Sequence, residues 1–465
     1  MKRHQICLFI LATIAALGAL SFIYPEEGIK IGAFSFEFSS LKGIPDYDAR
    51  EEESTITPED VLQRQRQAAL SKERDSLEHF LRTSSTRFHF PNDDLTFFDQ
   101  FFETLGQADS TSLRIIHYGD SQIEADRITS TFRDTLQKHF GGGGQGLVPI
   151  RTYYTSSTNC IASRELERYM TFARRAESNK YGPFGDFAKL HGSIDLALSQ
   201  PDRKNSAKQR FNKVTVLAGS TKGHGLTISC GSKTDQFPAD KDMVRAVFYI
   251  PDNKARADVK ISGEADLYGI LMDSNTGISV DNVPMRGSSG LSFTSMNAKQ
   301  LKTFYENENV KMILMQFGGN IVPAVKTERQ ISYFCRKIRK QIEYILRLAP
   351  DATIVFIGPS DMSTSVDGQR QTYPMLPQII DSLRHTANSA GIAYWDIYSA
   401  MGGRNSMLQW VRSDPALAGS DHVHFTNKGA QLIGEIMANS FMAHYDYYIW
   451  RKENNDIADG KDILF

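Results

Sequence analysis

The stretch that most constrains the fold runs from Leu113 to Thr129. Its apolar part, Leu113 to Tyr118, stops at Gly119-Asp120-Ser121, and a helical pattern follows without a gap. This pattern predicts a buried strand that turns directly into a helix. Ser121 would then stand clear of the sheet, with its backbone N–H among the free donors at the helix start. These are the needs of a nucleophile that must also stabilise an oxyanion, although Gly-Asp-Ser is common in plain turns and requires support from the rest of the chain.

The remaining pattern from Leu113 onward alternates strands with helices. Strands are expected at Ala265–Met272, Ile278–Val283, Val310–Phe317, Thr353–Gly358 and Ile392–Tyr398, and helices at Asn297–Tyr305, Arg329–Leu348, Leu376–Ala390 and Asn427–His444. Such alternation predicts an α/β fold, a parallel sheet with helices on both faces and therefore three layers. Active groups of these folds lie at the carboxyl ends of the strands.

A region of about residues 148–264 interrupts this alternation. Its short β-like runs are Lys213–Leu217, Leu226–Cys230, Val244–Ile250 and Ala257–Ile261, and no long helix separates them. This pattern favours an inserted all-β domain. Its aromatic side chains would form a core or a surface that stacks on sugars, and a core is favoured for most of them: Tyr153, Tyr154, Phe184, Phe187, Phe248 and Tyr249.

The N-terminus differs from the rest of the chain. Lys2, Arg3 and His4 precede the apolar run Ile6–Tyr24. Residues 1–25 are therefore expected to be an uncleaved membrane anchor, with a cleaved signal peptide as the alternative. Either reading places the protein outside the cytoplasm, tethered to the inner membrane or secreted. Residues 26–90 are expected to hold a strand, a charged linker and a helical spacer from Pro58, and residues 451–465 a polar tail.

Composition excludes some functions. The formal charge of −1 over 465 residues gives no electrostatic bias toward nucleic acid or anionic lipid. Cys160 and Cys230 could pair in an oxidising compartment, whereas Cys335 falls in a helical pattern and is expected to be a core residue.

Further candidate site residues follow later strands. Gly287 follows the strand Ile278–Val283, and Asn320 follows Val310–Phe317. Asp421 stands three residues before His424, so its carboxylate can reach one ring nitrogen and leave the other free for Ser121. Each has a plainer interpretation: Asn320 as a turn residue, Asp421 as a capping carboxylate, and Asp421, His422 and His424 as metal ligands. No further metal-ligand cluster accompanies them, so no metal is expected.

Taken in order, Gly119-Asp120-Ser121, Gly287, Gly318-x-Asn320 and Asp421-x-x-His424 resemble the four blocks of the SGNH, or GDSL-type, hydrolase family. Gln122 departs from the family pattern, which has Leu at that position. The peptidoglycan O-acetylesterase branch is similar in two further respects: the run Arg114–Ser121 followed by a glycine-rich segment, and a β-rich, carbohydrate-binding-like insert. The resemblance covers about Arg114–Gly144 and Leu267–His444, a little under half of the chain. It implies an SGNH domain of residues 91–147 and 265–450, divided by the insert.

The resemblance implies a serine esterase with Ser121 as nucleophile, His424 as base and Asp421 as its partner. The backbone N–H groups of Ser121 and Gly287 and the side chain of Asn320 would form the oxyanion hole, with Gly290 as an alternative donor. The implied substrate is an O-acetylated cell-envelope glycan, and no cofactor is needed. An O-acetyltransferase and a non-catalytic glycan-binding protein are the alternatives.

Overall fold

The computed structural model describes residues 3–23, 29–31, 34–36, 58–150, 160–171, 174–200, 210–251 and 254–459. Two compact units divide the chain, Met1–Leu70 and Ser71–Phe465. The first contains helix α1 (Arg3–Ile23) and an antiparallel hairpin of β1 (Ile29–Ile31) and β2 (Phe34–Phe36).

The expected membrane anchor is not supported. Among the described helices, none combines the length and the apolar character that a membrane span requires. The helix predicted from Pro58 is confirmed as α2 (Pro58–Thr83). The charged linker expected before this helix lies outside the described residues, as does the end of the tail, residues 460–465.

The second unit is built on a mainly parallel sheet with the strand order β13-β4-β14-β15-β18-β3. Its described strands are β3 (Phe88–His89), β4 (Ser112–Gly119), β13 (Gly277–Pro284), β14 (Val310–Gln316), β15 (Thr353–Ile357) and β18 (Ala393–Trp395). β4 pairs in parallel with both β13 and β14. β3 is an antiparallel edge strand, which the sequence analysis missed because two residues carry no readable periodicity.

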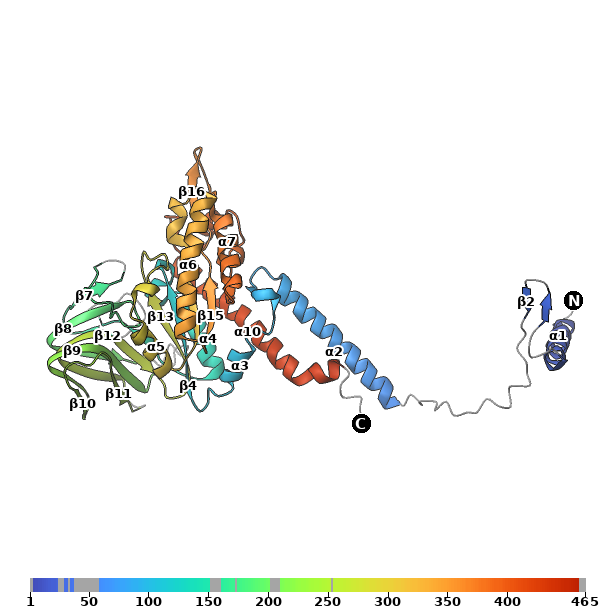
Figure 1. Ribbon diagram of the computed structural model, residues 1–465, viewed down its shortest axis with the longest axis horizontal. Coiled ribbons are helices and arrows are strands. Elements are labelled where there is room, and N and C mark those ends of the chain that lie inside the picture. The colour runs from blue at the N-terminus through green and yellow to red at the C-terminus, as the bar shows by residue number, and fades with distance from the viewer. Residues whose placement is uncertain are drawn as a thin grey trace. The chain divides into compact units, whose positions relative to one another are not determined.

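Helices cover both faces of this sheet (Figure 1). On β4, Ile115 packs in a core cluster with residues of α3 (Asp99–Leu105), α4 (Thr129–Phe140) and α10 (Asn427–Ala458). The next residue, Ile116, packs in the opposite cluster with residues of α5 (Ala298–Asn307), α6 (Glu328–Leu348) and α7 (Leu376–Ser389). Because successive strand residues point to opposite faces, this arrangement gives the three layers that the alternation predicted.

Between α4 and β13 the chain forms a second, antiparallel sheet. Its described strands are β5 (Gly146–Val148), β6 (Cys160–Ala162), β7 (Glu167–Met170), β8 (Asp186–Ser199), β9 (Lys213–Cys230), β10 (Lys233–Phe237), β11 (Val244–Tyr249) and β12 (Arg256–Asp273). The insert is thus a β-sheet, as the sequence pattern indicates. Runs expected to be separate strands are joined in β9 and in β12, because glycine and polar residues interrupt the apolar pattern in the middle of each strand.

The strand expected at Ala265–Met272 is not part of the parallel sheet. Residues Ala265–Met272 belong to β12, which pairs with β8 and β9 of the insert and not with the parallel strands. The expected division between residues 264 and 265 therefore falls inside one strand. At the other end of the chain, α10 is longer than expected, and Thr426 caps it in place of Asn427 by accepting a hydrogen bond from the Gly429 N–H.

Cys160, Cys230 and Cys335 are not paired. Cys160 lies on β6 and Cys230 on β9, and β8 and β12 separate these strands in the sheet. The possible disulfide between them is therefore absent. Cys335 is a buried core residue of α6, as predicted.

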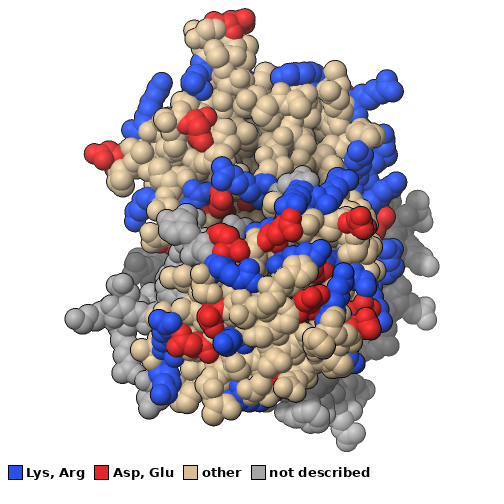
Figure 2. Space-filling model, turned by 90° about the vertical axis from the view of Figure 1, so that its left-hand side faces the viewer, with Lys and Arg blue, Asp and Glu red and all other residues tan. Residues whose placement is uncertain are grey.

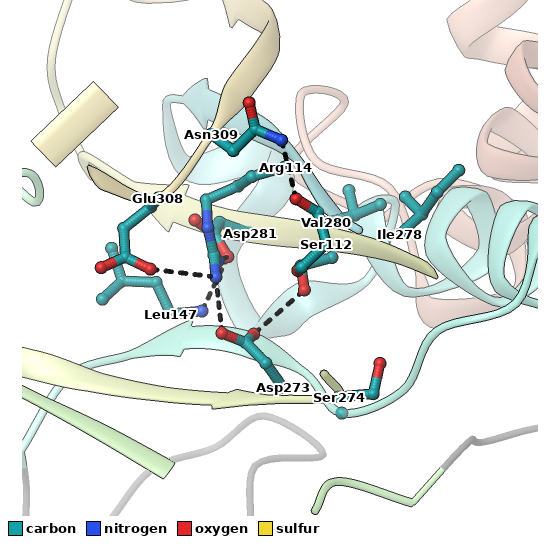
Figure 3. A network of polar contacts seen from close by, with 12 residues as sticks. Ser112, Arg114, Leu147, Asp273, Ser274, Ile278, Val280, Asp281, Glu308 and Asn309 are labelled. Carbon is teal, nitrogen blue, oxygen red and sulfur yellow. Dashed lines mark hydrogen bonds and ion pairs between the residues drawn. The ribbon is translucent and has the colours of Figure 1, made fainter. Parts of the chain in front are cut away.

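A buried ionic cluster joins the two sheets (Figure 3). The guanidinium of Arg114 on β4 lies 2.6 Å from Asp281 on β13, 2.5 Å from Asp273 at the end of β12 and 3.9 Å from Glu308. Asp281 also accepts a hydrogen bond from the Leu147 N–H of β5, at 2.8 Å. Burial alone lowers the pKa of Arg114, but the three carboxylates raise it above its ordinary value. Arg114 therefore stays charged and holds β4, β13 and the insert together.

We predict that Arg114→Met lowers the free energy of unfolding by about 3–5 kcal/mol, because it leaves buried carboxylates without their cation. Urea unfolding monitored by fluorescence measures this change. Arg256→Met is the matched control, since Arg256 and its partner Asp258 are exposed and the pair is worth about 1 kcal/mol or less. Equal losses in the two variants would contradict the role of the cluster.

Candidate active site

The turn after β4 is a short 3-10 helix, Ser121–Asp126, which separates the strand from α4. The prediction of an α-helix starting at Ser121 without a gap is therefore wrong. Ala125 and Asp126 adopt left-handed backbone conformations, with φ of 61° and 62°, which end the turn before α4 begins at Thr129. Asp126 is held by two hydrogen bonds from Arg133, at 2.7 and 2.9 Å, so the turn has a fixed shape.

The structure brings Ser121, His424 and Asp421 into one chain of hydrogen bonds. Ser121 Oγ lies 2.8 Å from His424 Nε2, and His424 Nδ1 lies 2.7 Å from Asp421 Oδ2. The other carboxylate oxygen of Asp421 accepts from the N–H groups of Val423 and His424, at 3.0 and 3.1 Å. Burial alone raises the pKa of Asp421, but these hydrogen bonds outweigh it and lower the pKa, which keeps the carboxylate charged beside the imidazole.

His422, the other histidine of this loop, takes no part in that chain. Its backbone has a φ of 58°, and partial burial followed by the charge of Arg370 lowers its pKa. Within the described residues, no group of three or more His, Cys, Asp or Glu side chains is arranged to hold a metal ion. The structure thus separates the two histidines that the sequence left as joint metal-ligand candidates.

A cavity of about 330 Å³ opens beside Ser121 and His424, and Gly287 and Asn320 both line it. Gly287 has a φ of +81°, and nothing lies within 4 Å of the position that a Cβ would take. Gly290 is placed differently: its N–H donates to Ser288 Oγ at 3.1 Å, and its Cβ position lies against Phe317. The geometry therefore favours Gly287 over Gly290 as a donor facing the cavity.

Asn320 is held in place from behind. Its Nδ2 donates to the Ser288 carbonyl at 2.9 Å and lies 3.4 Å from Asp120 Oδ2. Asp120 is buried, and its other oxygen accepts from the Gln122 N–H at 2.9 Å. Burial raises the pKa of Asp120 to about 6, although the hydrogen bond from Gln122 and the nearby His424 act in the opposite direction.

Sequence reasoning missed several residues that line the cavity. Asp120 and Gln122 flank Ser121 and were named with the first motif, but neither was given a role. Arg286 reaches the site beside Gly287 and lies 3.4 Å from Glu124. Ser360 follows β15, and the rule that active groups lie at strand ends would have found it.

His117, on the other hand, lies under the site as a structural residue. Burial lowers its pKa to about 3, so it is neutral, and it contacts Gln316 and Thr129 at 3.0 and 2.9 Å. Its burial and its partners in the core keep it apart from the residues that face the cavity.

Comparison with known proteins identifies the class. Residues 251–437 match the family model described as GDSL-like Lipase/Acylhydrolase, a range that includes Gly287, Asn320, Asp421 and His424 and begins after Ser121. The match shows a GDSL/SGNH-type acylhydrolase domain in this part of the chain, and it supports carboxylic ester hydrolysis as the class of activity. None of the curated proteins matches the sequence.

Among solved structures, the chain is similar to one titled "Peptidoglycan O-acetylesterase in action, 5 min". The alignment covers 76% of this chain and 97% of that one, with a TM-score of 0.62 and 19% sequence identity, which establishes a common fold. A family two carbohydrate esterase from Clostridium thermocellum in complex with cellohexaose aligns over 57% of this chain and 96% of its own, with 10% identity and a TM-score of only 0.27.

The raised pKa of Asp120 leads to a prediction about stability. A carboxyl group whose pKa is about 6 in the folded protein and 3.8 in the reference state stabilises the fold below pH 4 and loses that contribution as the pH rises through 6. Asp120→Asn removes the ionisation and keeps an oxygen for the Gln122 N–H. We expect the variant to gain stability relative to the wild type between pH 4 and pH 8, by at most about 3 kcal/mol. Thermal unfolding of both proteins at pH 4 and pH 8 measures this gain. A stability difference between variant and wild type that does not change with pH would contradict a raised pKa of Asp120.

Proposed function

We propose that this protein is a serine esterase that removes O-acetyl groups from a cell-envelope glycan, with peptidoglycan as the expected polymer. The observation that carries the proposal is the hydrogen-bonded chain Ser121–His424–Asp421 at a cavity that Gly287 and Asn320 also line. The fold shared with a peptidoglycan O-acetylesterase supports the choice of ester and polymer. The location outside the cytoplasm that the N-terminal sequence indicates belongs to the same proposal.

Each side chain has a role in the proposed reaction. Ser121 Oγ attacks the ester carbonyl carbon while His424 Nε2 takes the hydroxyl proton, and Asp421 stabilises the imidazolium that forms. The carbonyl oxygen becomes an oxyanion that accepts hydrogen bonds from the N–H groups of Ser121 and Gly287 and from Asn320 Nδ2. His424 then protonates the departing sugar oxygen as the C–O bond breaks, which leaves an acetyl group on Ser121.

Water completes the cycle by the same steps. His424 takes a proton from water, the resulting hydroxide attacks the acetyl carbonyl, and Ser121 leaves with the proton that His424 returns, so acetate is released. The cavity of about 330 Å³ lies at the low end of the range for ligand sites, which suits a small acyl group with part of one sugar ring.

The alternatives differ in what accepts the acetyl group. An O-acetyltransferase would pass it to a sugar hydroxyl in preference to water, and a non-catalytic glycan-binding protein would turn over no ester. Incubating the purified protein with O-acetylated glycan, with and without an added deacetylated acceptor, separates the three. Free acetate supports the esterase, acetylated acceptor supports the transferase, and binding without either product supports the third.

We predict that Ser121→Ala and His424→Ala each reduce ester turnover to background while leaving the far-UV circular dichroism spectrum unchanged. Because the two groups act as one unit, the double variant should be no slower than either single variant. Nitrophenyl acetate hydrolysis measures the effect, and His422→Ala is the matched control from the same loop. Loss of activity in His422→Ala with activity retained in His424→Ala would overturn the assignment of the base.

The insert is proposed to bind the polymer, whereas the catalytic residues all belong to the parallel-sheet domain. Of three earlier candidates for sugar stacking, Phe184 is buried in the core, and Tyr153 and Tyr154 lie outside the described residues. A groove of about 820 Å³ on the insert is another candidate for polymer binding. Partly buried Tyr169 lines it, with its ring stacked on Phe187 and the Arg174 guanidinium 4.8 Å from the ring centre. Charged side chains of both signs are interleaved on the face of the molecule seen in Figure 2. The groove itself is lined by Arg174, Arg175, Lys180, Lys189, Lys222 and Lys241 together with Glu177, Asp240, Asp242 and Asp266.

We predict that Tyr169→Ala slows acetate release from polymeric glycan several-fold and leaves nitrophenyl acetate turnover unchanged, because the contact of an aromatic ring with the polymer contributes about 0.5–1.5 kcal/mol. Tyr249→Ala is the matched control, since Tyr249 is an exposed tyrosine of the same sheet and does not line the groove. An equal loss of activity on both substrates would mean that the groove contributes to catalysis itself, and it would contradict a separate role in polymer binding.

A further inference from the structure

The loop that carries His424 has little structure of its own to fix its position. Between Gly419 and Phe425 it contains no helix, and its backbone passes through a left-handed residue, His422. Its internal backbone bonds are turns, Gly419 N–H to the His424 carbonyl at 2.8 Å and His422 N–H to the Gly419 carbonyl at 3.0 Å, and the Asp421 carboxylate bonds the loop's own N–H groups. The side chains of Asp421 and His424 are 52% and 41% exposed, so core packing does not hold them. Contacts from outside the loop must therefore fix the 2.8 Å approach of His424 to Ser121.

Gln122, the residue after Ser121, makes the first of these contacts. Its Nε2 donates to the Val423 carbonyl at 2.7 Å, and its Oε1 lies 3.4 Å from the Phe425 N–H. The side chain thus bonds the backbone on both sides of His424. Nε2 also lies 3.2 Å from Ser360 Oγ, in the segment that follows β15. Gln122 is buried, so water cannot easily replace these hydrogen bonds.

Arg127, five residues further along the same turn, makes the second contact. One guanidinium nitrogen donates to the Phe425 carbonyl at 2.8 Å, and the other donates to the Ser121 carbonyl at 3.0 Å. A third bond, from Nε to the Glu124 carbonyl at 2.9 Å, fixes the guanidinium in the turn. A planar guanidinium with several donors can bridge the two carbonyls, which lie on segments about 300 residues apart in the chain.

We propose that Gln122 and Arg127 are positioning residues that clamp the His424 loop to the Ser121 turn and so set the distance between base and nucleophile. The proposal rests on the proposed function, in which His424 takes the proton of Ser121. A misplacement of about 1 Å between reacting groups can cost about 100-fold in rate, so the clamp acts on turnover more than on substrate binding.

The clamp also explains the departure of this chain from the family pattern. A leucine at position 122 could fill the same space but could not donate to Val423 or accept from Phe425. With leucine, the loop would lose both of these bonds, and the exposure of Asp421 and His424 leaves little packing to replace them. The polar side chain at this position is therefore expected to be functional here, and leucine is the most informative replacement.

The experiment compares wild type, Gln122→Leu, Arg127→Gln and Arg127→Lys with nitrophenyl acetate as substrate. Gln122→Leu and Arg127→Gln should each lower kcat by about 10- to 100-fold with KM changed by less than about threefold. Arg127→Lys retains a donor that can reach one of the two carbonyls, so its kcat should lie between those of the wild type and Arg127→Gln.

Gln137→Leu is the matched control for Gln122→Leu. Gln137 is also a buried glutamine, and its Nε2 bridges two backbone carbonyls, of Gly144 and Ile278, away from the cavity. Its replacement should lower stability and leave kcat unchanged. Equal losses of kcat in Gln122→Leu and Gln137→Leu would show that position 122 acts only through stability, which overturns the clamp.

A second measurement tests the clamp without relying on activity. Hydrogen exchange followed by mass spectrometry should show faster exchange of the amides of residues 419–426 in Gln122→Leu and Arg127→Gln, with exchange in α6 unchanged. Unchanged exchange in this loop overturns the clamp even if the wild type hydrolyses acetyl esters. Faster exchange in variants of a protein that hydrolyses no ester supports the clamp and contradicts the proposed function, so the two failures are distinguishable.

Discussion

The buried contact of Arg114 with Asp273, Asp281 and Glu308 is the interaction on which the rest of the structure depends. Arg114 lies on β4, the strand that leads to Ser121, and Asp281 lies on β13, the strand that leads to Gly287. By bonding both strands and the end of β12, the cation fixes their relative positions, and the proposed nucleophile and oxyanion donor stand on the ends of these same strands. A charged group this deeply buried tolerates few geometries, because each carboxylate must find a hydrogen-bond donor.

The sequence predicted those parts of the fold that follow from local periodicity. The strands at β4, β13, β14 and β15 are apolar runs, and because parallel strands end at a common edge, Ser121, Gly287 and Asn320 could be placed together before any contact was known. The Asp421–His424 contact followed from spacing within one loop. The long strands β9 and β12 were divided, because polar and glycine residues in the middle of a strand resemble a turn in sequence while the sheet neighbours still pair with them.

What escaped prediction depends on contacts between segments far apart in the chain. The bonds of Gln122 and Arg127 to the backbone around His424 involve carbonyl groups, which have no signature in the sequence. The raised pKa of Asp120 likewise follows from burial beneath the cavity, which no local pattern reports. The site residues themselves can thus be read from residue types and spacing, whereas the groups that position them require the tertiary structure.

The placement of the insert affects how the protein is made. β4 and β13 are adjacent in the parallel sheet, with Ser112 opposite Gly277, yet the whole antiparallel sheet lies between them in the chain. During synthesis, β4 can pair with β13 only after the whole insert has been made. Contacts between residues this distant in sequence form slowly. The contact between Ser121 and His424 forms later still, since His424 lies 303 residues further along the chain. A ribosome-bound chain would therefore carry an incomplete site until the loop of His424 has been synthesised and has folded against the turn of Ser121.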